Sequence, residues 1–174
     1  GVEFKVNQNY DEFYHINETF VKQKGFGPLL GIRSINLDVI KRYGTLFTSE
    51  YKGDVLSGHL YLEDEDNIKL WLSASKRLEV DRERARLIGN ANRLLHWEAI
   101  KYAKGRGIRV FDWGGLWPEE EANNDARKKT INFFKQSFGG TTVICYNYRK
   151  IYSPIYKLGS NMLEKANCMR RLNG

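Results

Sequence analysis

The amino-acid sequence predicts an α/β fold, an α+β arrangement in which a central mixed β-sheet is flanked by helices. Three observations support this prediction. Short β-branched and aromatic runs lie in the first half of the chain, a long stretch with helical spacing follows them, and strand-like and helix-like segments then alternate. Antiparallel strands followed by strand–helix alternation indicate a mixed sheet with helices on both faces.

Length and composition set the broad class. A chain of 174 residues fits one domain, so we expect a single domain over residues 1–174. The composition is 41% hydrophobic and 28% charged, and no apolar run approaches the ~20 residues of a membrane span. We expect no membrane span and a cytoplasmic location. Cys145 and Cys168 lack the spacing of a zinc or redox site, which predicts two free, partly buried thiols and no metal.

The net charge indicates which kinds of partner the chain would bind. A net charge of +7 and a pI near 9.4 favour phosphate-bearing partners, whether a nucleotide cofactor, RNA or an anionic lipid headgroup. The alternative is a globular domain that is basic without such a partner.

The first half of the chain predicts a strand, two helices and a three-stranded meander. Val2–Val6 alternates as a strand does, and Asp11 is the expected N-cap of the helix that follows. Gly25–Gly31 is an expected loop, and Asn36 or Asp38 is expected to cap a second, short helix. The three predicted meander strands, separated by turn residues, are Thr45–Tyr51, Val55–Leu62 and Ile68–Ala74.

The second half predicts an alternation of helices and strands around a buried helix. The acidic run Glu119–Glu121 is interpreted most simply as a solvated loop, with a cap of the next helix as the alternative. The predicted elements are a helix over Asn92–Lys104, a strand over Arg109–Trp113, a helix over Ala126–Ser137, a strand over Thr141–Tyr148 and a closing helix over Ile155–Arg171.

The segment Arg86–Ala91 carries the first indication of function. Its sequence, Arg-Leu-Ile-Gly-Asn-Ala, resembles the donor loop of GNAT acyltransferases, Arg/Gln-x-x-Gly-x-Gly/Ala. In such a loop, small residues let backbone N–H groups approach a pyrophosphate, and the next helix presents its positive end to the same charge. The alternative is a tight turn into a helix capped by Asn90 or Asn92. On the first interpretation, the donor-binding residues are Arg86, Gly89, Asn90, Ala91 and Asn92.

Three later elements, in order, narrow the resemblance. They are a Leu-Leu-His-Trp-Glu-Ala-Ile helix from Leu94, an Asp-Trp-Gly-Gly strand end from Asp112 and a Phe-Lys-Gln-Ser-Phe-Gly element from Phe134. This set resembles the FemABX branch of the GNAT-like acyltransferases, the peptidoglycan bridge-forming aminoacyl transferases. The resemblance implies a GNAT fold and transfer of an acyl or aminoacyl group from a carrier to an amine through a tetrahedral intermediate.

Lys135 is the residue on which the expected chemistry depends. GNAT acetyltransferases commonly carry a Tyr at this position as the acid for the departing thiolate. A lysine cation suits charge stabilisation better than proton donation, and one such donor at an oxyanion contributes about 3 kcal/mol. We expect Lys135 to stabilise the developing charge and Phe134 to shape the donor pocket. Alternatively, Phe134 and Phe138 lie in the core and Lys135 neutralises the helix dipole.

Asp112 is the third expected catalytic residue. It ends an apolar strand beside two glycines, and ligands of open α/β sheets bind at such strand ends. There it would orient the acceptor amine or accept its proton, or it would hydrogen-bond the backbone of the glycine turn. His96 and Glu98 lie two apart and share no helix face, so we expect each in a core or surface role.

The tyrosines near the end of the chain have two interpretations. Aromatics among cations can stack RNA bases, whereas aromatics on one face of a strand more commonly pack in a core. The residues concerned are Tyr146, Tyr148, Tyr152 and Tyr156, with Arg149, Lys150 and Lys157 nearby.

The resemblance also sets expectations about donor and partners. The donor co-substrate would be acyl-CoA, such as acetyl-CoA, or aminoacyl-tRNA, with no permanently bound cofactor. The acceptor would be an amine, and a cell-wall precursor is one candidate. FemABX proteins typically contain two GNAT-like halves, of which this chain resembles the second, so a homodimer or a missing second half would complete the acceptor side. A non-catalytic GNAT-like binding or regulatory module is the remaining alternative.

Overall fold

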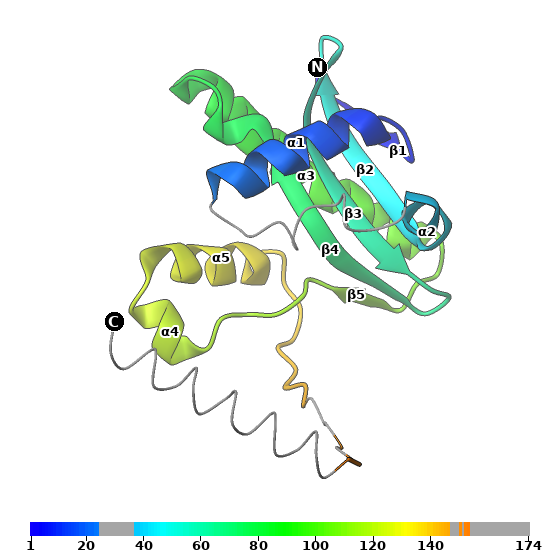
Figure 1. Cartoon of the computed structure of the whole chain (residues 1–174), viewed down its shortest axis with the longest axis vertical. Coiled ribbons are helices and arrows are strands. Elements are labelled where there is room, and N and C mark those ends of the chain that lie inside the picture. The colour runs from blue at the N-terminus through cyan, green and yellow to red at the C-terminus, as the bar shows by residue number, and fades with distance from the viewer. Residues whose placement is uncertain (25–36, 147–149, 151, 154–174) are drawn as a thin grey trace. The chain divides into compact units, whose positions relative to one another are not determined.

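A computed structural model describes residues 1–24, 37–146, 150 and 152–153 (Figure 1). The chain forms two compact units, residues 1–135 and 136–174, and the first contains the β-sheet. The elements in chain order are β1 (Glu3–Val6), α1 (Tyr10–Gln23), α2 (Leu37–Tyr43), β2 (Gly44–Tyr51), β3 (Asp54–Glu63), β4 (Asn67–Ser75), the 3₁₀ turn η3 (Lys76–Leu78), α3 (Arg82–Gly105), β5 (Val110–Asp112), α4 (Glu119–Asn123) and α5 (Ala126–Gln136).

The sheet is mixed, as predicted. Its strand order is β1-β2-β3-β4-β5, with antiparallel pairing from β1 to β4 and parallel pairing between β4 and β5. The β2–β3 and β3–β4 connections are short turns, whereas α3 forms the crossover that a parallel pair requires. The predicted fold class is therefore confirmed, and all three meander strands form over the predicted runs of β-branched and aromatic residues.

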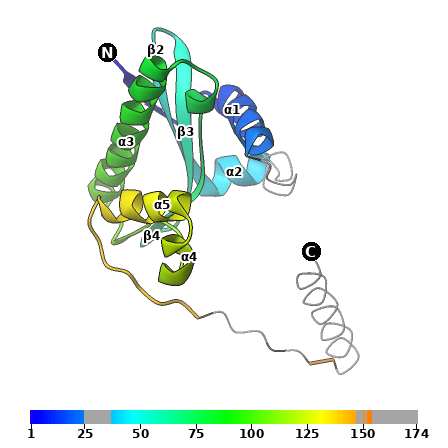
Figure 2. The same ribbon diagram turned by 90° about the vertical axis from the view of Figure 1, so that its left-hand side faces the viewer.

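Helices cover both faces of the sheet (Figure 2). On one face, α1 packs Phe13 and Ile16 against Leu46 and Leu60, which are all buried. The other face is covered by α3, whose apolar positions recur every three or four residues. The residues of this second core are Phe47, Tyr61, Ile68, Leu95, Ala99 and Ala103, with Leu56, Ile88 and Ala91 in an adjoining cluster.

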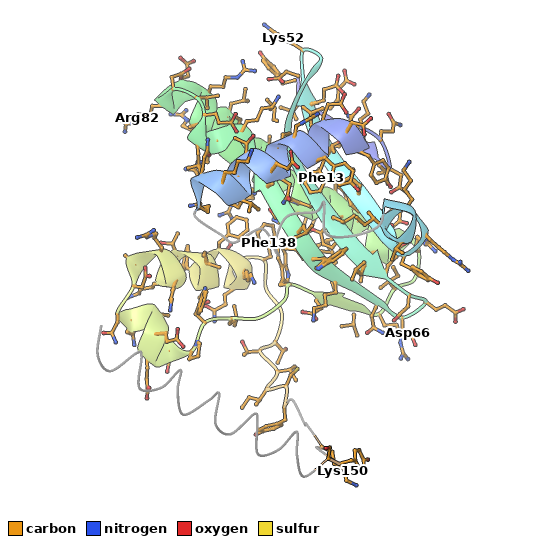
Figure 3. The ribbon with its side chains drawn as sticks, in the orientation of Figure 1. Phe13, Lys52, Asp66, Arg82, Phe138 and Lys150 are labelled. Atoms are coloured by element: carbon orange, nitrogen blue, oxygen red, sulfur yellow. The ribbon has the colours of Figure 1, made fainter. Side chains whose placement is uncertain are left out.

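Gly58 lets α1 approach β3 closely. A Cβ atom at Gly58 would lie 2.3 Å from Cδ2 of Phe13, whose ring is 1% exposed and lies between α1 and the sheet (Figure 3). Such overlap forces a buried ring out of its packed position. We therefore expect Gly58→Ala to lower the free energy of unfolding by about 1–3 kcal/mol, measured by urea denaturation.

Gly105→Ala is the matched control for this substitution. A Cβ atom there meets nothing within 4 Å, so the protein should keep its stability. Equal stabilities of the two variants would contradict the close packing of α1 on β3.

Several expected elements differ from the structure. Asn9, at φ 60°, precedes α1 as its cap residue without a side-chain cap hydrogen bond, and Asp11 lies in the first turn instead. The expectation that Asp11 caps this helix is wrong. Glu119–Glu121 forms the start of α4 and not a loop, because three acidic side chains at a helix N-terminus are favourable.

Two expectations for the C-terminal part of the chain are wrong. Residues 141–146 contain no strand, so this part of the predicted strand Thr141–Tyr148 is wrong, and Cys145 is exposed where we expected a partly buried thiol. A strand needs a partner for its backbone groups, and the apolar pattern alone does not provide one. The predicted loop Gly25–Gly31, the helix Ile155–Arg171 and Cys168 lie outside the described residues.

No helix in the described ranges has both the length and the apolar character that crossing a membrane requires.

Candidate functional site

The candidate site lies where β4 and β5 part. Their parallel pairing has three residue pairs and ends at Lys69↔Asp112, whereas β4 continues to Ser75. The register of β4 against β3 shifts at the next residues, since Tyr61 pairs with Leu70 and Leu60 with Leu72. The extra residue is Trp71, a β-bulge, and bulges occur preferentially beside active sites. The edge of β4 beyond Lys69 is therefore free of β5.

The connection from β4 to α3 corrects the expected donor loop. The helix begins at Arg82, and the Asp81 side chain accepts hydrogen bonds from the N–H groups of Glu83 and Arg84 at 2.9 and 3.0 Å. Arg86–Ala91 is therefore helical, and the prediction of a loop there is wrong. Because these backbone N–H groups lie inside α3, they cannot cradle a pyrophosphate in the way that we expected.

The five expected donor-binding residues consequently point in different directions. Arg86 and Asn90 are exposed on α3, Ala91 is buried in the core, and the Asn92 side chain turns inward to His59. The guanidinium of Arg77, from η3, lies beside Gly89, because a Cβ atom added at Gly89 would be 3.6 Å from the central carbon of that guanidinium. The alternative caps, Asn90 and Asn92, are also wrong, because both residues are inside the helix.

The predicted catalytic residues gather at the carboxyl end of β5. Lys135 Nζ donates a hydrogen bond to the carbonyl of Gly115 at 2.7 Å. Asp112 Oδ1 accepts from the Gly114 N–H at 2.7 Å, and its Oδ2 lies 3.3 Å from Lys69 Nζ. Asp112 thus holds the glycine turn, the alternative that the sequence left open, while Lys135 joins the end of α5 to the same turn.

Phe134 belongs to an aromatic group beside this turn. Its ring centroid lies 6.5 Å from that of Trp113 and 5.6 Å from that of His96, and the Arg93 guanidinium lies 5.0 Å from its centre. Trp113 also contacts His96, at 4.8 Å between centroids. Rings from α3, from α5 and from the residue that follows β5 therefore meet beside the glycine turn.

Two stacked imidazoles adjoin this aromatic group, and one of them, His96, belongs to it. The His59 and His96 rings are 3.7 Å apart at an interplanar angle of 26°, and both are buried. His59 Nε2 donates to Asn92 Oδ1 at 2.8 Å, since the amide oxygen can only accept, and His96 Nδ1 shares a 2.8 Å hydrogen bond with Tyr61 Oη. His59 Nδ1 has no hydrogen-bond partner among the described residues.

The electrostatics keep this network uncharged near neutral pH. Burial lowers the pKa of His59 to about 4, against the opposing effect of its hydrogen bond to Asn92. Burial also lowers the pKa of His96, and the nearby His59, Lys135 and Arg93 act in the same direction. The pKa of Tyr61 is raised by burial. Each shift disfavours the charged form in the interior.

Lys135 is affected by the same environment. Burial lowers the pKa of its ammonium group, and the negative charge of Asp112 opposes that shift. Unlike the imidazoles, Lys135 is half-buried and forms part of the turn surface.

Sequence reasoning missed His59 and the role of His96. The two residues are 37 positions apart, and their contact depends on the register between β3 and α3. One signal was present: His59 and Tyr61 are two apart in one strand, so both face the same side of the sheet. Glu98, considered beside His96, forms an ion pair with Lys101 at 2.7 Å.

A hollow of about 400 Å³ lies elsewhere in the first unit. None of the candidate site residues lines it, and its lining includes charged side chains such as Lys41, Glu63 and Arg106. The chemistry of the β5 turn is therefore not associated with this hollow. No three His, Cys, Asp or Glu side chains of the described ranges are grouped so that they could hold a metal ion.

Comparison with known proteins identifies the class that this geometry defines. Residues 38–128 match the family described as Acetyltransferase (GNAT) domain, more than half of the chain. The chain belongs to this family and is an acyltransferase domain. No curated protein matches the sequence.

Solved structures show the same fold at low sequence identity. An aminoglycoside acetyltransferase from an uncultured soil metagenomic sample is 12% identical, with 87% of this chain and 99% of that chain covered and a TM-score of 0.55. An acetyltransferase of Trypanosoma brucei is 10% identical, with 87% of this chain and 100% of that chain covered and a TM-score of 0.53. The ribosomal-protein-alanine N-acetyltransferase of Brucella melitensis biovar Abortus 2308 is 7% identical, with 88% of this chain and 100% of that chain covered and a TM-score of 0.50.

Proposed function

We propose that the protein transfers an acyl group from acyl-CoA to an amine, at the divergence of β4 and β5. The observation that carries this proposal is the end of β4–β5 pairing at Lys69↔Asp112, with Lys135 fixed at the glycine turn just beyond it. The reaction forms a C–N bond at the acyl carbonyl and breaks the thioester C–S bond. The amine loses a proton and the departing thiolate gains one.

The open edge of β4 suits the arm of CoA. That arm is an extended chain with two amide groups, and an extended chain with amides binds a free strand edge by adding to the sheet. From Leu70 to Ser75, β4 has no pairing with β5, so its backbone groups on that edge could serve such a ligand. An acyl group at the end of the arm would then lie toward the glycine turn.

The phosphates of the donor require positive charge, and we place them near η3 and the first turns of α3. Asp81 already satisfies two N–H groups at this helix end, so side chains rather than backbone amides would bind the phosphates. Arg77 lies beside Gly89, and Arg86 is exposed one turn before Gly89 on α3. In this proposal Arg86 and Gly89 remain at the donor site, but Ala91 and Asn92 do not.

The expected catalytic residues then take separate roles. Lys135 would stabilise the oxyanion of the tetrahedral intermediate, where a preorganised cation is an effective catalyst. Phe134, between Arg93 and Trp113, would form a wall of the acyl pocket. Asp112 would shape the turn through Gly114 and favour the charged form of Lys135, rather than accept a proton.

Aminoacyl-tRNA is the second candidate donor. The Phe134-Lys135 pair in place of Phe-Tyr and the net charge of +7 support it, as does the FemABX resemblance. Under this alternative a missing GNAT-like half or a second copy of the chain would complete the acceptor side, and a cell-wall precursor amine would be one acceptor.

Thermal unfolding with each donor tests the proposed function. Acetyl-CoA at a hundred times its Kd should stabilise the protein by about 2.7 kcal/mol. Its affinity should fall only shallowly with salt, whereas binding of an aminoacylated acceptor-stem mimic would fall steeply, because each neutralised phosphate releases counterions. Release of free CoA in the presence of an amine panel then establishes transfer.

Arginine variants show where the phosphates bind. Arg77→Ala and Arg86→Ala should each weaken acetyl-CoA binding, since a charge-assisted contact to phosphate is lost. Arg109→Ala removes the same charge before β5, where the side chain pairs with Asp66, and should leave donor affinity unchanged. Absence of both binding and transfer with every donor would overturn the proposed function in favour of a non-catalytic module.

A further inference from the structure

We propose that the His59–His96 imidazole stack positions Lys135 for the transfer reaction, acting through Trp113 and Phe134. The inference rests on the proposed function and assigns a task to two buried residues that the reaction itself does not touch. Both are positioning residues, because neither imidazole reaches the surface at which donor and acceptor would meet.

The stack is held rigidly from two elements of the fold. On β3, His59 is fixed by its Nε2–H donating to Asn92, and on α3, His96 is fixed by its bond with Tyr61, both at 2.8 Å. These two bonds set the planes of both rings, which a purely apolar pair would not require. The two rings, 3.7 Å apart with 26° between their planes, form a fixed surface against which the side chains of Trp113 and Phe134 pack.

The two segments that hold Lys135 in place both pack against His96. The ring of His96 contacts Trp113, which precedes the glycine turn, and Phe134, which precedes Lys135 in α5. The hydrogen bond from Lys135 Nζ to the Gly115 carbonyl therefore joins two segments that each pack against His96. A shift of this imidazole would move the donor and the acceptor of that bond independently.

Base catalysis is a weaker explanation of the same stack. A catalytic base must have a pKa near that of the group from which it takes a proton. An amine acceptor is far more basic than the imidazole of His59, whose pKa is about 4. The imidazoles would therefore stay neutral through the reaction. Their exposure, 0% for His59 and 2% for His96, also excludes direct contact with an acceptor at the surface.

The sharpest test is a double-mutant cycle between His96 and Lys135. His96→Phe keeps an aromatic ring but cannot pair with Tyr61. In the wild-type background it should lower kcat by about 10- to 100-fold, because small misplacements of a catalytic group are costly, with little change in the KM for the acyl donor. In the Lys135→Ala background the same substitution should lower kcat less than about twofold.

A second variant and a control accompany the cycle. Tyr61→Phe deletes only the hydroxyl that holds His96 and should show the same dependence on Lys135, which keeps the test valid if His96→Phe does not fold. His15→Phe alters an exposed histidine of α1 and should change nothing. Equal losses with and without Lys135 would mean that the stack is a packing element alone, and would overturn the inference while the proposed function stands.

An activity-independent measurement separates the two proposals. The rate at which an amine-reactive reagent labels Lys135, relative to the exposed Lys129 of the same helix, reports how firmly Lys135 is held. We expect this ratio to rise at least about threefold in His96→Phe and Tyr61→Phe and to stay constant in His15→Phe. An unchanged ratio in both network variants overturns the inference even if the wild-type protein transfers no acyl group.

Discussion

Replacing Lys135 with alanine should lower kcat for acyl transfer by about 100-fold or more, the usual loss when one oxyanion donor is removed. Lys135 Nζ is held 2.7 Å from the Gly115 carbonyl at the end of β5, so its position is set before a substrate arrives. Steady-state kinetics with saturating donor would measure the effect, and KM should change far less than kcat because the interaction develops in the transition state.

Lys129→Ala is the matched control for this loss. It removes the same charge from an exposed position of α5 and should leave kcat within about twofold, in line with the small effects of surface substitutions. A Lys135→Ala protein with unchanged turnover would assign this residue to the helix end alone, where it would merely neutralise the dipole.

Stability should fall as the pH is lowered from 7 to 5, by about 2 kcal/mol from His59 alone, at 1.36 kcal/mol per pKa unit. The unfolded chain binds a proton to this histidine near its ordinary pKa of 6.5, whereas burial holds the folded pKa at about 4. The stabilisation is therefore complete above pH 6.5 and is lost as the pH falls toward 4. His96 acts in the same direction, since burial lowers its pKa and the nearby His59, Lys135 and Arg93 add to that shift.

Urea denaturation at pH 7 and pH 5 would measure this dependence. His15→Gln, which changes an exposed histidine outside the stack, is the matched control. In contrast, His59→Gln removes one of the two buried rings and should make the pH dependence shallower over the same interval, with the contribution of His96 remaining. A wild-type stability that is equal at both pH values would contradict the burial of a neutral imidazole pair.

The sheet was predictable because its signals are local. Runs rich in β-branched and aromatic residues, with turn residues at positions 52–54 and 65–67, define three strands whose pairing follows from short connections. The predicted start of α3 at Asn92 is wrong because Arg86–Ala91, which resembles a donor loop, also continues the helical spacing of Ile88, Ala91 and Leu95. Asp81, a good N-cap residue, was the sequence signal for the earlier start.

The candidate site was predictable in part. The order of the motifs predicted Asp112, Phe134 and Lys135 as catalytic residues. The structure places all three around the β5 turn. The bond between Asp112 and the glycine turn was one of two open interpretations, and distances were needed to select it. His59 and His96 could not be paired in advance, because residues on a strand and a distant helix meet only through the packing of α3 on the sheet.

The short pairing between β4 and β5 also bears on the order in which the chain folds. The pairs β2–β3 and β3–β4 join neighbours in sequence and close small loops, so they can form early. The three pairs of β5 must wait until the whole of α3 has crossed the sheet, which costs more loop-closure entropy. We therefore expect the candidate site at the end of β5 to form late in folding, after the pairs β2–β3 and β3–β4.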